Sequence, residues 1–170
     1  GNNASNATVD LRGFGVTGTQ NTLILVDGRR AVDIDLSGVQ WSAVPLSMIE
    51  RIEIVRGGGG VLYGEGATAG VINIITRSPR GLPPSLTLRA SAGSYDTREG
   101  GAHGSFPVGS IGVGVFGSHL VTDGYRQNNQ LQQQNGVGDI RFTGDQGGAY
   151  LNLSADNQHL GFPGGRLVTP

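Results

Sequence analysis

Hydrophobic and polar residues follow different patterns in the two parts of this chain, and the first part opens with a strand and a turn. Residues 23–26 are a continuous apolar run, which is typical of a strand covered on both faces. Asp27 and Gly28 come directly after it, and an Asp-Gly pair between strand-like runs predicts a tight hairpin turn. Residues 29–34 are then expected to form the return strand.

Two more strands and two short helical segments are predicted before residue 78. Pro45 suits the first position of a short helix, and runs of β-branched residues favour strands. The glycines after Arg56 end one of these strands. The helical segments are residues 45–50 and 61–63, and the strands are residues 52–55 and 71–76. Residues 1–78 therefore predict an α+β domain, a mixed sheet with short helices.

The pattern changes at a proline- and glycine-rich linker, residues 79–84. Beyond it, long stretches alternate between apolar and polar residues, and their polar faces carry Arg, Asp and Asn. Short breaks alternate with a longer polar loop, which favours consecutive antiparallel strands of a transmembrane β-barrel over residues 85–170. A soluble β-sandwich alternates equally well and stays open on periodicity alone. The apolar faces comprise Leu86, Leu88 and Ala90; Ile111, Val113 and Val115; Ile140 and Phe142; and Ala149, Leu151, Leu153 and Ala155.

Composition excludes several functions. The chain has 31 glycines, a net charge of −1 and no cysteine, and all 12 of its basic residues are arginines. No basic patch supports nucleic-acid binding. The lack of cysteine excludes disulfides and thiolate chemistry. No apolar run is long enough for a membrane helix.

No catalytic or cofactor motif is present. The glycine-rich residues 57–70 contain no lysine, which a phosphate-binding loop requires. The three histidines have no second ligand type at a suitable spacing, and no Gly-x-Ser-x-Gly elbow occurs. Asp33 and Asp35 alternate on one strand face, which leaves a Ca²⁺ pair open beside a solvated face. We expect no enzyme activity, no cofactor and no metal.

Two arginines stand at the edges of predicted buried strands. Arg12 and Arg56 each precede a glycine. An unpaired charge would be costly in such a place, so each is a candidate for a specific contact. The alternative is a surface arginine at a strand end.

Several motifs resemble the plug of TonB-dependent outer-membrane receptors, in their order and spacing. They lie in residues 11–14, 21–30, 44–57, 62–64 and 70–76. The chain departs from the family pattern at residues 57–60, a glycine run where the family usually has proline after the first glycine. The segment from residue 85 fits the family's early barrel strands by texture.

The resemblance implies an active-transport receptor in the outer membrane of a Gram-negative bacterium. Such a receptor binds a scarce ligand, most often a ferric siderophore, and imports it with energy supplied by TonB. The expected partners are therefore TonB, through a segment missing from this chain, the siderophore and outer-membrane lipid. A β-rich surface binding or adhesion module without transport is the alternative.

The resemblance also implies site residues. The arginines of the two Arg-Gly motifs, Arg12 and Arg56, would hold the plug by pairing with barrel glutamates beyond residue 170. Plug loops that follow the first motif would touch the ligand. The expected ligand contacts are Gly18, Thr19 and Gln20 in the loop of residues 15–20, and Trp41 at the end of residues 33–41. The alternative is that both loops merely turn the chain.

Overall fold

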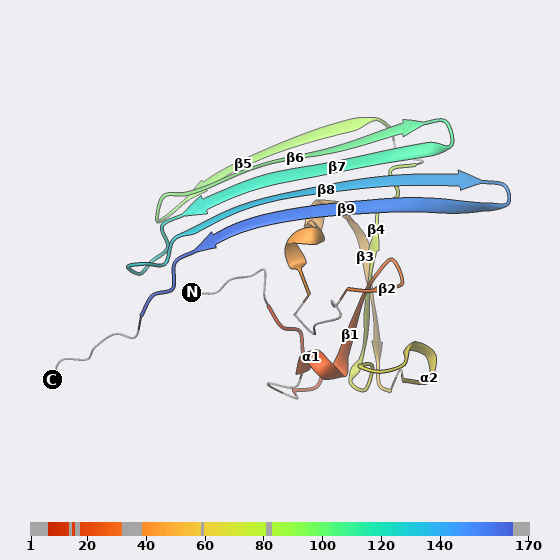
Figure 1. Cartoon of the computed structure of the whole chain (residues 1–170), viewed down its shortest axis with the longest axis horizontal. Helices are drawn as coiled ribbons and strands as arrows, with labels where there is room; N and C mark the ends of the chain where they lie inside the picture. Colours follow the sequence, from red (N-terminus) through yellow and green to blue (C-terminus); the bar gives the residue numbers. More distant parts are fainter. Residues whose placement is uncertain are drawn as a thin grey trace. The chain divides into compact units, whose positions relative to one another are not determined.

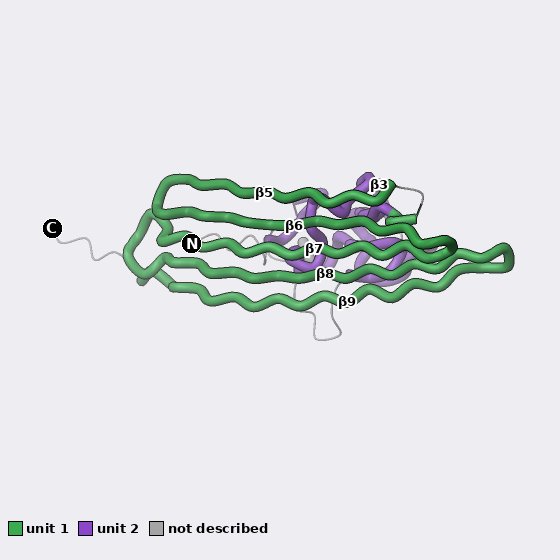
Figure 2. Tube along the Cα trace, turned by 90° about the horizontal axis from the view of Figure 1, so that it is seen from above, with its two compact units in different colours: residues 1, 78–170 green, residues 2–77 purple. Residues whose placement is uncertain are grey.

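The computed structural model describes residues 7–13, 15, 18–31, 39–58, 60–80 and 83–164, with the backbone alone at positions 18, 19 and 61. It divides into two compact units (Figure 2). One comprises residues 2–77, and the other comprises residues 78–170 together with residue 1.

The first unit contains a four-stranded mixed sheet (Figure 1), as the sequence predicts. Its strand order is β2-β1-β4-β3, with β1 and β4 parallel and the other two pairings antiparallel. The strands are β1 (Thr22–Val26), β2 (Arg29–Arg30), β3 (Ile49–Arg56) and β4 (Gly70–Thr76).

Apolar side chains cover the central strands on both faces. Leu23 and Leu25 pack with Ala67 and Val71 on one face, whereas Ile24 packs in a separate cluster on the other. Burying one such aliphatic side chain stabilises the fold by roughly 1.5–3 kcal/mol. The continuous apolar run of β1 thus reflects coverage on both sides, as predicted.

The Asp27-Gly28 turn is also confirmed. Both residues have positive φ, 49° and 79°, as a type I′ hairpin turn requires. The described part of the return strand is shorter than predicted, because β2 comprises Arg29 and Arg30 and Ala31 already lies outside it. Residues 32–38, which include the possible Asp33 and Asp35 pair, lie outside the described residues.

The short helices differ in part from the prediction. They are α1 (Gly18–Asn21), η3 (Trp41–Ala43), η4 (Leu46–Met48) and α2 (Gly60–Tyr63). Over the described ranges, no helix is long and apolar enough to cross a membrane.

Two of these helices correct the sequence-based expectation. A polar loop was expected through residue 20, but α1 begins at Gly18, and the Asn21 carbonyl accepts a hydrogen bond from the distant Ala69 N–H at 2.8 Å. Pro45 precedes η4 with extended backbone, and Ile49 already pairs with Thr76. Long-range pairing therefore ends the second helix earlier than local propensity suggests.

The second unit is a five-stranded antiparallel meander in the order β5-β6-β7-β8-β9, as predicted (Figure 1). Two-residue turns join β6 to β7 and β8 to β9, and a longer connection joins β7 to β8. The strands are β5 (Ser85–Gly93), β6 (Thr97–Val108), β7 (Ile111–Thr122), β8 (Leu131–Gly144) and β9 (Gly147–Leu160).

The two faces of the meander have opposite chemistry. The cross-strand register places Val113, Ile140 and Leu151 in one row of the apolar face. That face is open, and Leu88 and Leu153 are 72% and 63% exposed. Asp139 lies on the opposite face and is 2% exposed. A soluble sandwich sheet would bury its apolar face, so the exposure pattern favours the barrel interpretation.

Candidate functional site

The first Arg-Gly motif is a turn held by one carboxylate. Asp10 accepts hydrogen bonds from the backbone N–H groups of Arg12 and Gly13, both at 3.0 Å, and of Gly15 at 2.8 Å. Gly13 and Gly15 both have positive φ, which favours glycine. The sequence reasoning missed Asp10, although an Asp two or three residues before a glycine is a turn signal.

The two Arg-Gly motifs meet at Gly70, the first residue of β4. A Cβ on Gly70 would clash with the Val55 carbonyl oxygen and would lie 2.9 Å from Leu11 Cδ1. Leu11 precedes Arg12, and Val55 precedes Arg56. Gly70 also has φ +151°, which L side chains rarely adopt. Only glycine therefore lets both motifs reach this point.

Both arginines are exposed at this junction. The Arg12 guanidinium lies beside the second motif, with Nη2 3.9 Å from the position of a Cβ on Gly57. In the described part of the chain, neither Arg12 nor Arg56 forms an ion pair or a side-chain hydrogen bond. Two guanidinium groups are thus free to bind acidic groups elsewhere. Their expected glutamate partners, beyond residue 170, stay a prediction.

A third arginine, Arg30, fastens the glycine-rich loop after α2. Its Nη2 donates hydrogen bonds to the carbonyl oxygens of Tyr63 at 3.0 Å and Glu65 at 2.7 Å. Gly64 and Gly66 flank the guanidinium and have positive φ. No local pattern in the sequence indicates this contact, because 33 residues separate Arg30 from Tyr63.

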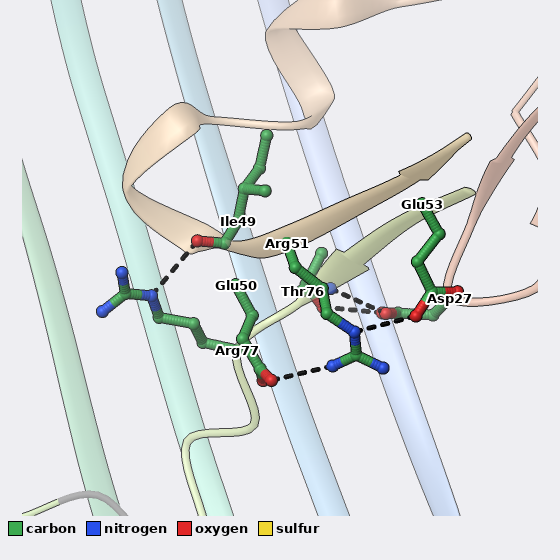
Figure 3. Close-up of polar contacts among 7 residues, drawn as sticks. All are labelled: Asp27, Ile49, Glu50, Arg51, Glu53, Thr76 and Arg77. Carbon is green, nitrogen blue, oxygen red and sulfur yellow. Dashed lines mark hydrogen bonds and ion pairs between the residues drawn. The ribbon is translucent and has the colours of Figure 1, made fainter. Parts of the chain in front are cut away.

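Asp27 locks the hairpin turn onto the end of β4 (Figure 3). Its Oδ1 accepts the Thr76 backbone N–H at 2.8 Å and its Oδ2 accepts the Thr76 hydroxyl at 2.6 Å. The Gly28 N–H donates to Asn73 Oδ1 at 3.1 Å. These hydrogen bonds tie the turn to the end of β4.

The exposed edge of β3 carries a charged trio (Figure 3). Arg51 forms ion pairs with Glu50 and Glu53, both at 2.8 Å. The hydrogen bond to Glu53 raises the pKa of Arg51. These pairs face solvent and contribute little to stability.

The expected ligand contacts lie in two places of the first unit. Gly18, Thr19 and Gln20 share the single turn of α1, and the Gln20 side chain is exposed. Trp41 is partly buried; its Nε1–H donates to the Ala7 carbonyl oxygen at 2.6 Å and its ring packs against the Ile24 cluster. Trp41 thus has a structural role, whatever its role toward a ligand.

The histidines are spread over separate strands. His103, His119 and His159 lie on β6, β7 and β9. Across the described ranges, no group of three or more His, Asp or Glu side chains gathers as a metal site would require.

Comparison with known proteins decides the family. Residues 1–71 match the family model described as the TonB-dependent Receptor Plug Domain. Residues 1–71 belong to the plug family of the TonB-dependent receptors. The two Arg-Gly turns that meet at Gly70 therefore lie in a receptor plug, and the meander after residue 84 agrees with the first barrel strands of such a receptor.

Relatives in this receptor family differ in the ligands that their names state. Over 99 residues the chain is 38% identical to the Vitamin B12 transporter BtuB of Vibrio vulnificus (strain CMCP6), covering 58% of this chain and 16% of that protein. It is 40% identical over 91 residues to the Ferrienterobactin receptor of Escherichia coli (strain K12), covering 48% of this chain and 12% of that protein.

A solved structure extends the likeness into the meander. The ferric-catecholate import receptor Fiu of E. coli K12 superposes with a TM-score of 0.64 at 26% identity, over 84% of this chain and 21% of that one. The chain thus spans about a fifth or less of the proteins that it resembles.

Proposed function

We propose that the complete receptor is an active transporter of the Gram-negative outer membrane. It binds a ferric siderophore outside the cell and imports it with energy supplied by TonB. No bond of the ligand need break, so the protein is a transporter and not an enzyme. The plug supplies movable structure, while the strands satisfy their own backbone groups within lipid.

One observation carries this proposal: a plug domain is continuous, in one chain, with a meander whose apolar face is open. Leu86 and Leu151 on that face are 65% and 52% exposed. Exposing such a face to water would be costly, at about 25 cal/mol for each Å² of apolar area, whereas lipid removes that cost. The proposal that these strands lie in the outer membrane follows from this contrast.

The siderophore is proposed on the basis of the relatives. The Fiu structure, which aligns with most of the chain, is that of a ferric-catecholate import receptor. The Ferrienterobactin receptor of E. coli is similar over the plug. The exposed Gln20 on α1 offers hydrogen-bonding groups at the proposed ligand loop.

The test is uptake by cells that carry the complete receptor. Radiolabelled ferric enterobactin and vitamin B12 are offered separately to cells with and without TonB. We expect accumulation of the ferric siderophore only when TonB is present. Binding without TonB-dependent accumulation would instead indicate a surface binding module, and accumulation of vitamin B12 alone would overturn the proposed ligand class.

A further inference from the structure

A three-residue segment that follows the plug, residues 78–80, lies against the meander; we call it the strap. Pro79 at its centre is buried, and its carbonyl oxygen accepts a long hydrogen bond from the Ser105 hydroxyl at 3.4 Å. Ser105 itself is only 2% exposed. The linker is therefore not a free tether along its whole length.

The surface beneath the strap is made of glycines. A Cβ on Gly112 would lie 2.6 Å from the Arg80 backbone nitrogen and 2.9 Å from the Pro79 carbonyl carbon. A Cβ on Gly114 would lie 3.8 Å from Pro79 Cβ. Gly112 has no positive φ, so glycine is needed here for space and not for backbone conformation. Gly138 on the other face has nothing within 4 Å of its Cβ position.

An ion pair on β8 lies next to the two glycines of β7. Arg141 binds Asp139 in a bidentate arrangement, with Nε–Oδ1 at 2.8 Å and Nη2–Oδ2 at 3.0 Å. The register places Asp139 opposite Gly114 and Arg141 opposite Gly112. Because the two charges offset one another, the pair is neutral overall, and an apolar proline ring can lie beside it.

The residue just before the strap is fastened to the plug. The Arg77 N–H donates to the Met48 carbonyl oxygen at 2.8 Å. Arg77 Nε donates to the Ile49 carbonyl oxygen at 3.1 Å (Figure 3). Only Ser78 separates this attachment from Pro79. Proline fixes its own φ and keeps the preceding residue extended, so the backbone rotations that remain are those between Arg77 and Ser78.

We propose that the strap is a fixed anchor on β6–β8 and that the plug moves about the Arg77–Ser78 junction. This inference rests on the proposed function, because it states which part of the chain stays in place during transport. Gly112 and Gly114 are the positioning residues of the anchor. Rearrangement of the plug then begins at Arg77 and proceeds toward the N-terminus, without release of Pro79.

The contact between the strap and Gly112 is tested by amide exchange in the complete receptor. Gly112→Leu should displace the strap and speed exchange roughly tenfold at the Arg80 amide, whose nitrogen lies against Gly112. Gly138→Leu is the matched control, since its side chain enters open space on the other face, and exchange should not change. Unchanged strap exchange in a folded Gly112→Leu receptor would overturn the proposal.

A disulfide gives a second test that does not depend on the folding of the leucine variant. The chain has no cysteine, and the Cβ positions of Pro79 and Gly114, 3.8 Å apart, fit a disulfide. Pro79→Cys with Gly114→Cys should crosslink nearly completely under mild oxidation. Pro79→Cys with Gly138→Cys should not. Equal crosslinking of both pairs, or of neither, would contradict a seated strap.

The crosslinked receptor shows whether the anchor is permanent. Uptake of ferric enterobactin and of vitamin B12 by the Pro79→Cys, Gly114→Cys receptor is measured before and after reduction of its introduced disulfide. Equal uptake supports the proposal, whereas loss that reduction restores means that the strap must detach. If the wild-type receptor, assayed alongside, imports neither probe, the proposed function fails, while exchange and crosslinking still decide whether the anchor exists.

Discussion

The Arg12 guanidinium lies beside Gly57, with Nη2 3.9 Å from the position that a Cβ on Gly57 would occupy. The two residues are far apart in sequence and belong to different Arg-Gly motifs. Their proximity places the positive charge of the first motif against the turn of the second. Solvent or an acidic partner can satisfy that exposed guanidinium.

Gly70 is expected to be the least replaceable residue of this junction. Gly70→Ala would drive a methyl group into the Val55 carbonyl and strain the backbone at φ +151°. We expect a loss of about 2–4 kcal/mol in the unfolding free energy of the plug. The unfolding free energy is measured by urea titration, with amide exchange in β4 as the probe. Gly58→Ala is the control, because Gly58 has open space and no positive φ; equal effects would refute the packing argument.

The arginines themselves should hold the plug in the complete receptor. Arg56→Ala should speed amide exchange across the plug, by the loss of a contact worth on the order of 3 kcal/mol if the pair is fully desolvated. Arg51→Ala removes an equal charge whose partners face solvent, so it should leave exchange nearly unchanged. Identical plug protection in wild type and Arg56→Ala would count against the predicted barrel glutamate.

The Asp27 carboxylate should stabilise the hairpin beyond its effect on the backbone. Asp27→Ala removes both bonds to Thr76 and should cost roughly 1.5–3 kcal/mol of local stability. Asp96→Ala carries a similar left-handed backbone penalty, since Asp96 has φ 51°, but loses only an exposed ion pair with Arg98. Local stability from amide exchange should fall more at Asp27. A similar loss at both sites would show that the turn conformation alone matters.

The proposed role of residues 15–20 in ligand binding can be tested by introducing a large side chain. Gly18 opens α1, and Gly18→Trp should fill the loop apex and lower the affinity for ferric enterobactin at least tenfold, a change of about 1.4 kcal/mol. Gly58→Trp places the same side chain in open space elsewhere on the plug and should bind normally. Normal affinity of a well-expressed Gly18→Trp receptor would remove this loop from the binding site.

Local residue patterns were sufficient for the main elements of the fold. The Asp27-Gly28 pair predicted its turn, the β-branched run predicted β4, and alternation predicted the meander. These features depend on neighbours within a few residues, where propensity and periodicity act.

Contacts between distant segments could not be predicted in this way. The Arg30 bonds to the loop after α2 and the seat of Pro79 on Gly112 each join residues more than thirty positions apart. Nothing in the local pattern around Arg30 or Pro79 differs from that of an ordinary surface arginine or linker proline. The roles proposed for Gly18 and Arg56 likewise depend on the family resemblance, because the contacts expected for them are with a ligand and with glutamates beyond residue 170.

The short stretch between the attachments of Arg77 and Pro79 also limits reach. Two residues of extended chain span at most about 7 Å, so Pro79 can lie no farther than this from Arg77, however the plug turns. This short connection gives the two units of one chain a high effective concentration for each other.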